Sequence, residues 1–129
     1  MSVNKNVVKI LFDDLPYVEL RANYHKSNFW GERSESTRIA RAEAYTRCRN
    51  IVILKTIERC EIEEVFTIPT KRRMDIEGLM FAVKPWIDGI CDAQIIRDDS
   101  WQYVQKLSGR IVYKKGERYT EIIITEVEK

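Results

Sequence analysis

An apolar pattern with a helical period runs from Leu79 to Ile96 and contains a proline. Pro85 has no backbone N–H to donate, so a helix built on this pattern should be kinked or divided there. Gly89 should loosen or end the helix, and Trp86 is expected to pack in the core. The apolar residues that recur at steps of three and four are Leu79, Met80, Ala82, Val83, Trp86, Ile87 and Ile90.

Shorter stretches rich in β-branched residues predict strands before and after this helix. Residues 34–50 carry an alanine-rich stripe typical of a second helix, whereas residues 51–56 could extend that helix or begin a strand. The run Ile122–Ile124 suggests burial on both faces and hence an inner strand. The expected strands are residues 7–12, 61–68, 101–113 with an interruption near Ser108 and Gly109, and 119–127. Two main helices and about four strands predict an α+β fold.

The length and composition limit the class of protein. The chain has 129 residues, of which 44% are hydrophobic, enough for one domain with one core over residues 1–129. We expect a soluble, cytoplasmic protein, because no run of about 18 apolar residues and no apolar leader is present. Three cysteines without a CxxC pair and one histidine favour neither a disulfide framework nor a zinc site.

Positive charge is concentrated in the first part of the chain. Residues 21–49 hold seven Lys and Arg against three acidic residues, and Lys71, Arg72 and Arg73 follow the second expected strand. Such a distribution suits an anionic partner such as a phosphate backbone. The alternative is an ordinary solvated loop and helix face.

Acidic residues stand at both ends of the apolar helix. Asp75 and Glu77 precede it, and Asp98 and Asp99 follow it. Oxygen donors without His or Cys suit a hard cation, Mg²⁺ or Mn²⁺, which can activate water for attack on a phosphate. The alternative is structural, because D-x-E often caps a helix and D-D-S often forms a turn.

Residues 75–101 resemble the RusA-type Holliday junction resolvases, small endodeoxyribonucleases common in phages and prophages. In that family the signature begins Asp-x-Asp-Asn-Leu and ends Asp-Asp, and some phage members carry Lys-Pro-x-x-Asp-Gly between. Asp75, Glu77 and Leu79 match the start, 84–89 match the middle, and Asp98 with Asp99 match the end. The basic, aromatic residues 21–30 and the Arg-rich helix after them are similar to the amino-terminal part of the family.

The resemblance implies a small mixed sheet, a homodimer and magnesium-dependent cutting of four-way or branched DNA in a bacterial host cell, with no small-molecule cofactor. It assigns Asp75, Glu77 and Asp99 as metal ligands and catalytic residues, and Asp88 and Asp98 as residues that could orient them. Lys84 could supply the catalytic cation. The residues expected to bind DNA are Arg21, His25, Lys26, Arg33, Arg38, Lys71, Arg72 and Arg73.

The sequence departs from the signature at three positions. Glu77 replaces Asp, Gly78 replaces Asn, and Phe81 stands where the signature lysine belongs, one helical turn before Lys84. Three hypotheses follow: a junction-resolving nuclease, a branched-DNA-binding protein of the same fold that cuts poorly or not at all, and a structural protein whose carboxylates only cap and turn.

Overall fold

The computed structural model describes residues 6–21, 29–53 and 55–128, with the backbone alone for residues 29–33. The elements in chain order are β1 (Val7–Phe12), the 3-10 helix η1 (Val18–Leu20), α1 (Phe29–Cys48), β2 (Cys60–Ile68), α2 (Ile76–Ala82), α3 (Lys84–Asp92), β3 (Val104–Tyr113) and β4 (Tyr119–Glu126). The expected α+β fold with two main helices and a small mixed sheet is confirmed.

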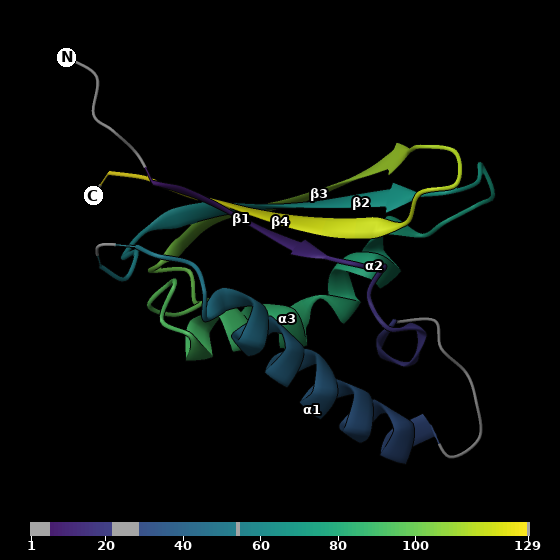
Figure 1. Ribbon diagram of the computed structural model, residues 1–129, viewed down its shortest axis with the longest axis horizontal. Helices are drawn as coiled ribbons and strands as arrows, with labels where there is room; N and C mark the ends of the chain where they lie inside the picture. Colours follow the sequence, from purple (N-terminus) through teal and green to yellow (C-terminus); the bar gives the residue numbers. More distant parts are fainter. Residues whose placement is uncertain (1–5, 22–28, 54, 129) are drawn as a thin grey trace.

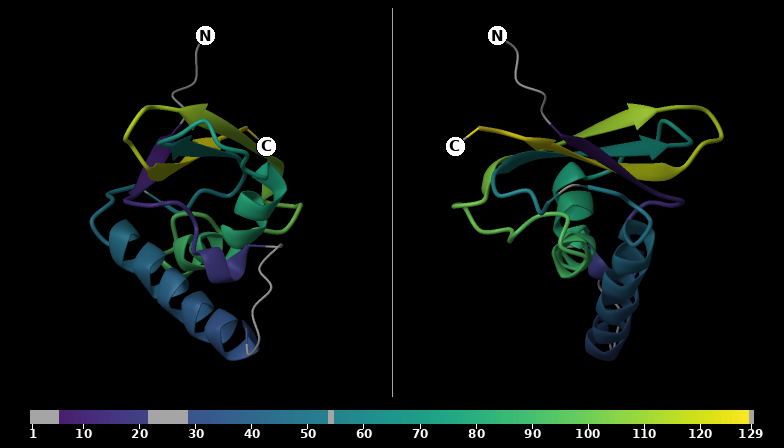
Figure 2. Two further views of the ribbon diagram at one scale, coloured as in Figure 1. Left: turned by 90° about the vertical axis from the view of Figure 1, so that its right-hand side faces the viewer. Right: turned by 60° about the vertical axis from the view of Figure 1, so that its left-hand side comes forward.

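The four strands form one sheet in the order β1-β4-β2-β3. β4 pairs antiparallel with both β1 and β2, whereas β2 and β3 are parallel. The connection between the parallel strands therefore has to cross over, and it contains α2 and α3. All helices lie on one face of the sheet (Figures 1 and 2). The predicted inner strand is confirmed, because β4 lies between β1 and β2. The expected burial on both faces is wrong, since Ile122 and Ile124 are fully buried but Ile123 is only half-buried.

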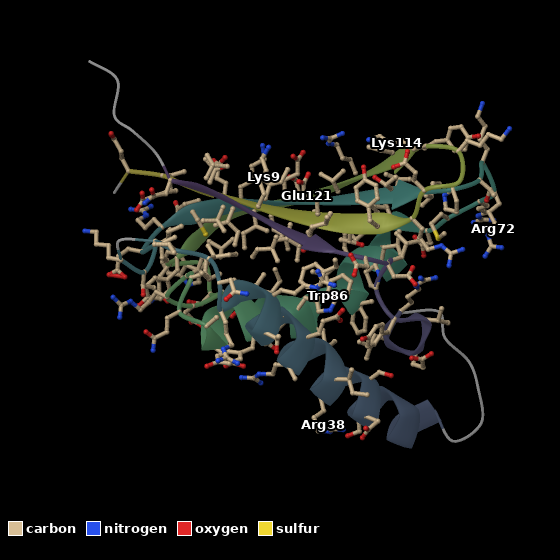
Figure 3. The ribbon with its side chains drawn as sticks, in the orientation of Figure 1. Lys9, Arg38, Arg72, Trp86, Lys114 and Glu121 are labelled. Carbon is tan, nitrogen blue, oxygen red and sulfur yellow. The ribbon has the colours of Figure 1, made fainter. Side chains whose placement is uncertain are left out.

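Strand alternation separates a covered face from an open face. In β1, Val8, Ile10 and Phe12 are buried, and the residues between them are exposed. Lys9 of β1 and Glu121 of β4 lie on the open face, away from the helices (Figure 3). The core therefore lies between the sheet and the helical layer.

The apolar pattern from residue 79 to residue 96 is divided as expected. α2 ends at Ala82, Val83 joins it to α3, and Pro85 occupies the first turn of α3. Proline is tolerated there because first-turn N–H groups have no partner within the helix. The expectation that Gly89 ends the helix is wrong. α3 continues to Asp92, and Gly89 instead lets α1 approach, since a Cβ there would lie 2.3 Å from the carbonyl oxygen of Arg41.

Other boundaries also differ from the prediction, the largest differences being in α1 and β3. α1 begins at Phe29 rather than at residue 34, and described residues between 51 and 56 belong to neither a helix nor a strand. β3 begins at Val104 and runs without interruption through Ser108 and Gly109. Gly109 is used for close packing, because a Cβ there would lie 2.6 Å from Met80 Sδ.

Trp86 is 2% exposed and lies in the core, as predicted. Its ring stacks on Phe12 with centroids 4.0 Å apart, and its Nε1 donates a hydrogen bond to Glu43 of α1. This tryptophan therefore joins α3 to the first strand and to α1, beneath the sheet in Figure 3. In the described part of the chain, no helix has the length and apolar character needed to cross a membrane.

Candidate functional site

Asp75 is the N-cap of α2. Its backbone is extended (φ −87°, ψ 112°), and its Oδ1 accepts a hydrogen bond from the backbone N–H of Glu77 at 3.1 Å. The first N–H groups of a helix need such acceptors, so the capping interpretation of D-x-E holds for Asp75. Glu77 lies in the first turn with its side chain exposed.

A second group of charges gathers where α3 begins. Lys84 Nζ donates to Asp88 Oδ1 at 2.7 Å, one turn along α3, and to the carboxylate of Asp99. Asp99 follows α3 in the turn before β3, fifteen residues from Lys84. The fold therefore brings together three residues that the sequence had assigned to the site.

The carboxylates affect the titration of their neighbours. Burial lowers the pKa of Lys84, but the hydrogen bonds to Asp88 and Asp99 raise it more, so the pKa lies above its ordinary value. The pKa of Cys91 rises to about 12 through burial and the negative field of Asp99, Asp98 and Asp88. Lys84 is consequently a stable cation within a negative field.

Asp98 belongs to the turn itself. Hydrogen bonds from the backbone of Asp99 and from the Ser100 side chain lower the pKa of the Asp98 carboxyl. This agrees with the turn interpretation of D-D-S for Asp98, whereas Asp99 points to Lys84. The two adjacent acids thus have different roles.

A cavity of about 120 Å³ lies beside Lys84 and Asp99. Its lining is largely apolar and includes Met80 and Ile87, but Glu64 of β2 also lines it. Glu64 is 1% exposed, and its Oε1 has no hydrogen-bond partner in the described structure. Burial raises the pKa of Glu64 to about 8, so this carboxyl is protonated at neutral pH.

A larger cavity of about 360 Å³ lies near the start of α2. Arg21, Arg72 and Arg118 all line it, and Met74, next to Asp75, forms part of the wall. The pKa of Arg21 lies below its ordinary value. Burial lowers it most, the negative charge of Asp14 raises it, and the positive charges of Arg118 and Arg72 lower it further. The guanidinium of Arg21 also donates to the carbonyl oxygen of Pro16 at 2.9 Å and 3.1 Å. Three arginines distant in sequence are therefore neighbours.

Two of the three carboxylates predicted to hold a magnesium ion have partners within the protein. Asp75 Oδ1 caps α2 and Asp99 binds Lys84. Among the described residues, no group of three or more His, Cys, Asp or Glu side chains is placed to hold a metal. The donors have the right chemistry for a hard cation, but Asp75, Glu77 and Asp99 as a ligand set stay a prediction.

The residues expected to bind DNA lie in several places. Arg72 lines the larger cavity with Arg21, and Lys71 lies over the Tyr113 ring at 5.2 Å. Arg73 is exposed in the same loop. Arg38 is on α1, far from Arg72 in Figure 3, and pairs with Glu35. His25, Lys26 and the Arg33 side chain lie outside the described structure.

Sequence reasoning missed Glu64 and Arg118. The signal for Glu64 was available, because in β2 it shares the even-numbered phase of the buried residues Ile62, Phe66 and Ile68. No comparable signal marked Arg118, whose position near Arg21 and Arg72 depends on the pairing of distant strands. No protein-family model matches the sequence, and no curated protein matches it either.

Proposed function

We propose that the chain is an endodeoxyribonuclease of the RusA type that cuts four-way or branched DNA. The resemblance of residues 75–101 to that family motivates the proposal. The observation that carries it is the meeting of Lys84 with Asp88 and Asp99, because a cation and two acids expected at the site share one location.

The residues have distinct tasks in this proposal. Lys84 remains protonated at neutral pH, so it can pair with an oxygen of the phosphodiester that is cut. Asp88 holds the Lys84 ammonium from the next helical turn. Asp99 has to be released by Lys84 before it can take part in binding a metal ion. Arg21 and Arg72 would contact phosphates beside Asp75.

The proposal includes magnesium or manganese because of the donor atoms alone. Asp75, Glu77 and Asp99 offer only oxygen, which these cations prefer. Such an ion, when bound, supplies charge neutralisation and water activation in phosphoryl transfer. We assign it no step, because the described carboxylates are not arranged around one point. A homodimer in the bacterial cytoplasm would present two sites to the two strands of a junction.

A second candidate function is binding of branched DNA with little or no cutting. The pairing of Asp99 with Lys84 and the capping role of Asp75 favour it, because both carboxylates already have partners. The exposed Phe81, in the position of the signature lysine, also favours it. This candidate predicts binding that weakens with salt and no cleavage with any divalent metal.

A junction cleavage assay separates the two candidates. The purified protein is incubated with a labelled synthetic four-way junction and a series of metals that includes Mg²⁺ and Mn²⁺. We expect paired, symmetrical nicks with 5′-phosphate ends. Removing a group that only orients a metal ligand lowers activity by about 10- to 100-fold. Because Asp99 is proposed as a ligand itself, Asp99→Asn should slow cutting by at least about 100-fold. Junction affinity, measured in EDTA, should be retained.

Asp13→Asn is the matched control, because Asp13 is an exposed acid that pairs with Arg47 of α1. The control should cut at the parental rate. Cutting that survives Asp99→Asn overturns the site assignment, and tight binding without cutting in any metal supports the second candidate. A protein that neither binds nor cuts junctions would contradict both and favour a purely structural role for the carboxylates.

A further inference from the structure

The turn between β3 and β4 lies against the loop that follows β2. The backbone N–H of Lys114 donates to the carbonyl of Ile68 at 3.0 Å, and that of Gly116 donates to the carbonyl of Pro69 at 3.2 Å. Gly116 has φ +79°, a backbone conformation that favours glycine, so the turn has a defined shape. Arg72 and Lys114 lie at this same end of the molecule in Figure 3.

These two segments carry six exposed cations. We call them the cationic end: Lys71, Arg72, Arg73, Lys114, Lys115 and Arg118. Within residues 69–74 and 113–119 the only acidic residue is Glu117. The hydrogen bonds between the segments thus hold like charges together, which raises the local positive potential.

The cationic end is also poorly neutralised by its surroundings. In the described structure, Arg118 approaches Asp14 at 3.8 Å, and the other five cations reach no carboxylate within 4.0 Å. By contrast, Arg41 and Arg97 each have an acidic partner at 2.6 Å and 2.7 Å. Positive charge is therefore available to an external anion at this end of the molecule.

We propose that the cationic end binds the phosphate backbone of duplex DNA, with the β3–β4 turn supplying half of the contact surface. The inference rests on the proposed function, which makes DNA the partner. It adds Lys114, Lys115 and Arg118, which the sequence had not assigned to DNA. Arg72 and Arg118 also line the cavity that reaches Met74, so a bound backbone continues towards Asp75.

Two observations favour a duplex backbone over unpaired bases. The cations are spread over two segments rather than directed to one point, as a row of phosphates requires. A cation lies over one face of each aromatic ring at this end, since Lys71 lies 5.2 Å from the Tyr113 ring and Lys114 lies 5.6 Å from the Tyr119 ring. A ring face that a lysine occupies is a poor platform for base stacking, on which single-strand binding depends.

The test measures the salt dependence of DNA binding by the full chain. A labelled duplex and a four-way junction are titrated by fluorescence anisotropy in EDTA at several NaCl concentrations between about 50 and 200 mM. The variant is Lys114→Gln/Lys115→Gln/Arg118→Gln. The slope of log K against log salt should become shallower by about 2 to 3, because each lost phosphate contact removes about 0.9. Affinity at 100 mM NaCl should fall by at least about tenfold.

The matched control removes the same charge elsewhere, through Lys9→Gln/Lys55→Gln/Lys106→Gln, three exposed lysines outside the cationic end. Its slope and affinity should remain close to the parental values, and circular dichroism should show both triple variants folded. An unchanged slope in the turn variant, or an equal loss in the control, overturns the proposal. Preferential binding to oligo(dT) or to anionic lipid vesicles over the duplex also overturns it.

Binding in EDTA does not depend on cutting, so this result and the cleavage result are separable. If the chain never cuts junctions but the turn variant shows a shallower dependence of log K on log salt, the inference about the cationic end stands and the nuclease proposal fails. If the chain cuts and the slope is unchanged, the reverse holds.

Discussion

Glu64 is the residue whose chemistry conflicts most with its position. A carboxyl group lies on the covered face of β2, 1% exposed, with one oxygen lacking a partner. Desolvation of a charged carboxylate is costly, so the group keeps its proton instead. Glu64 lines the same cavity as Lys84 and Asp99, so an uncharged carboxyl group lies beside the charged residues of the candidate site.

This position predicts an unusual pH dependence of stability. Burial raises the pKa of Glu64 from 4.5 to about 8, so the folded state holds a proton that the unfolded state releases between those values. The free energy of unfolding should therefore fall as the pH rises through this window, by up to about 4 to 5 kcal/mol. Glu64→Gln should remove this fall and be the more stable protein at pH 8.5, as measured by urea denaturation.

Glu61→Gln serves as the control, because Glu61 is an exposed acid of the same strand on the opposite face. It should keep the parental dependence on pH. Parallel stability curves for the parent and Glu64→Gln would show that Glu64 is charged in the folded state.

The division between α2 and α3 was predictable at the scale of elements, because Pro85 removes a donor whatever the tertiary context. The boundaries of α1 and β3 were not. Gly109 resembled a strand interruption in the sequence, but it accommodates Met80 from α2, a contact that depends on how the helix and the sheet pack. The resemblance assigned Lys84 and Asp99 to one site, but the direct contact between them was not predicted, because it depends on how the turn before β3 packs against α3.

Two helical glycines should respond oppositely to the same substitution. Gly89→Ala should destabilise the protein by about 2 to 3 kcal/mol, because its Cβ would lie 2.3 Å from the Arg41 carbonyl oxygen and 2.7 Å from Ala44 Cβ. Gly78→Ala should be neutral or stabilise by up to about 1 kcal/mol, since its nearest neighbour would be 3.7 Å away and alanine is the better helix former. Urea midpoints of the two variants measure the difference. Equal effects would mean that α1 and α3 do not approach at Gly89.

At the scale of the whole molecule, the sequence suggested that positive charge is concentrated in the first part of the chain. The structure distributes charge differently. Arginines of α1 are largely engaged within the protein, as Arg41 with Asp92 and Arg47 with Asp13 show. Cations from both halves of the chain meet instead at the cationic end. Sequence position alone could not reveal this, because the pairing of β2, β3 and β4 decides which loops are neighbours.

The arginines of α1 and the cations of the cationic end should contribute unequally to DNA binding. Arg38→Gln should weaken binding less than twofold, because Arg38 pairs with Glu35 and lies on α1 away from the cationic end. Arg72→Gln should weaken it by roughly three- to tenfold through loss of a phosphate contact. Anisotropy titrations at 100 mM NaCl compare the variants. Equal losses would extend the DNA-binding surface to α1.

α2 is a short helix within the crossover between two parallel strands, and two of the positions that depart from the signature, Glu77 and Phe81, have exposed side chains there. Substitutions on this side of α2 leave the buried Leu79 and Ala82 in place. For the nuclease that we propose, substitutions at these exposed positions can therefore change catalysis without disturbing the core. The two candidate functions, cutting and binding without cutting, thus differ at a few solvent-facing positions of one stable fold.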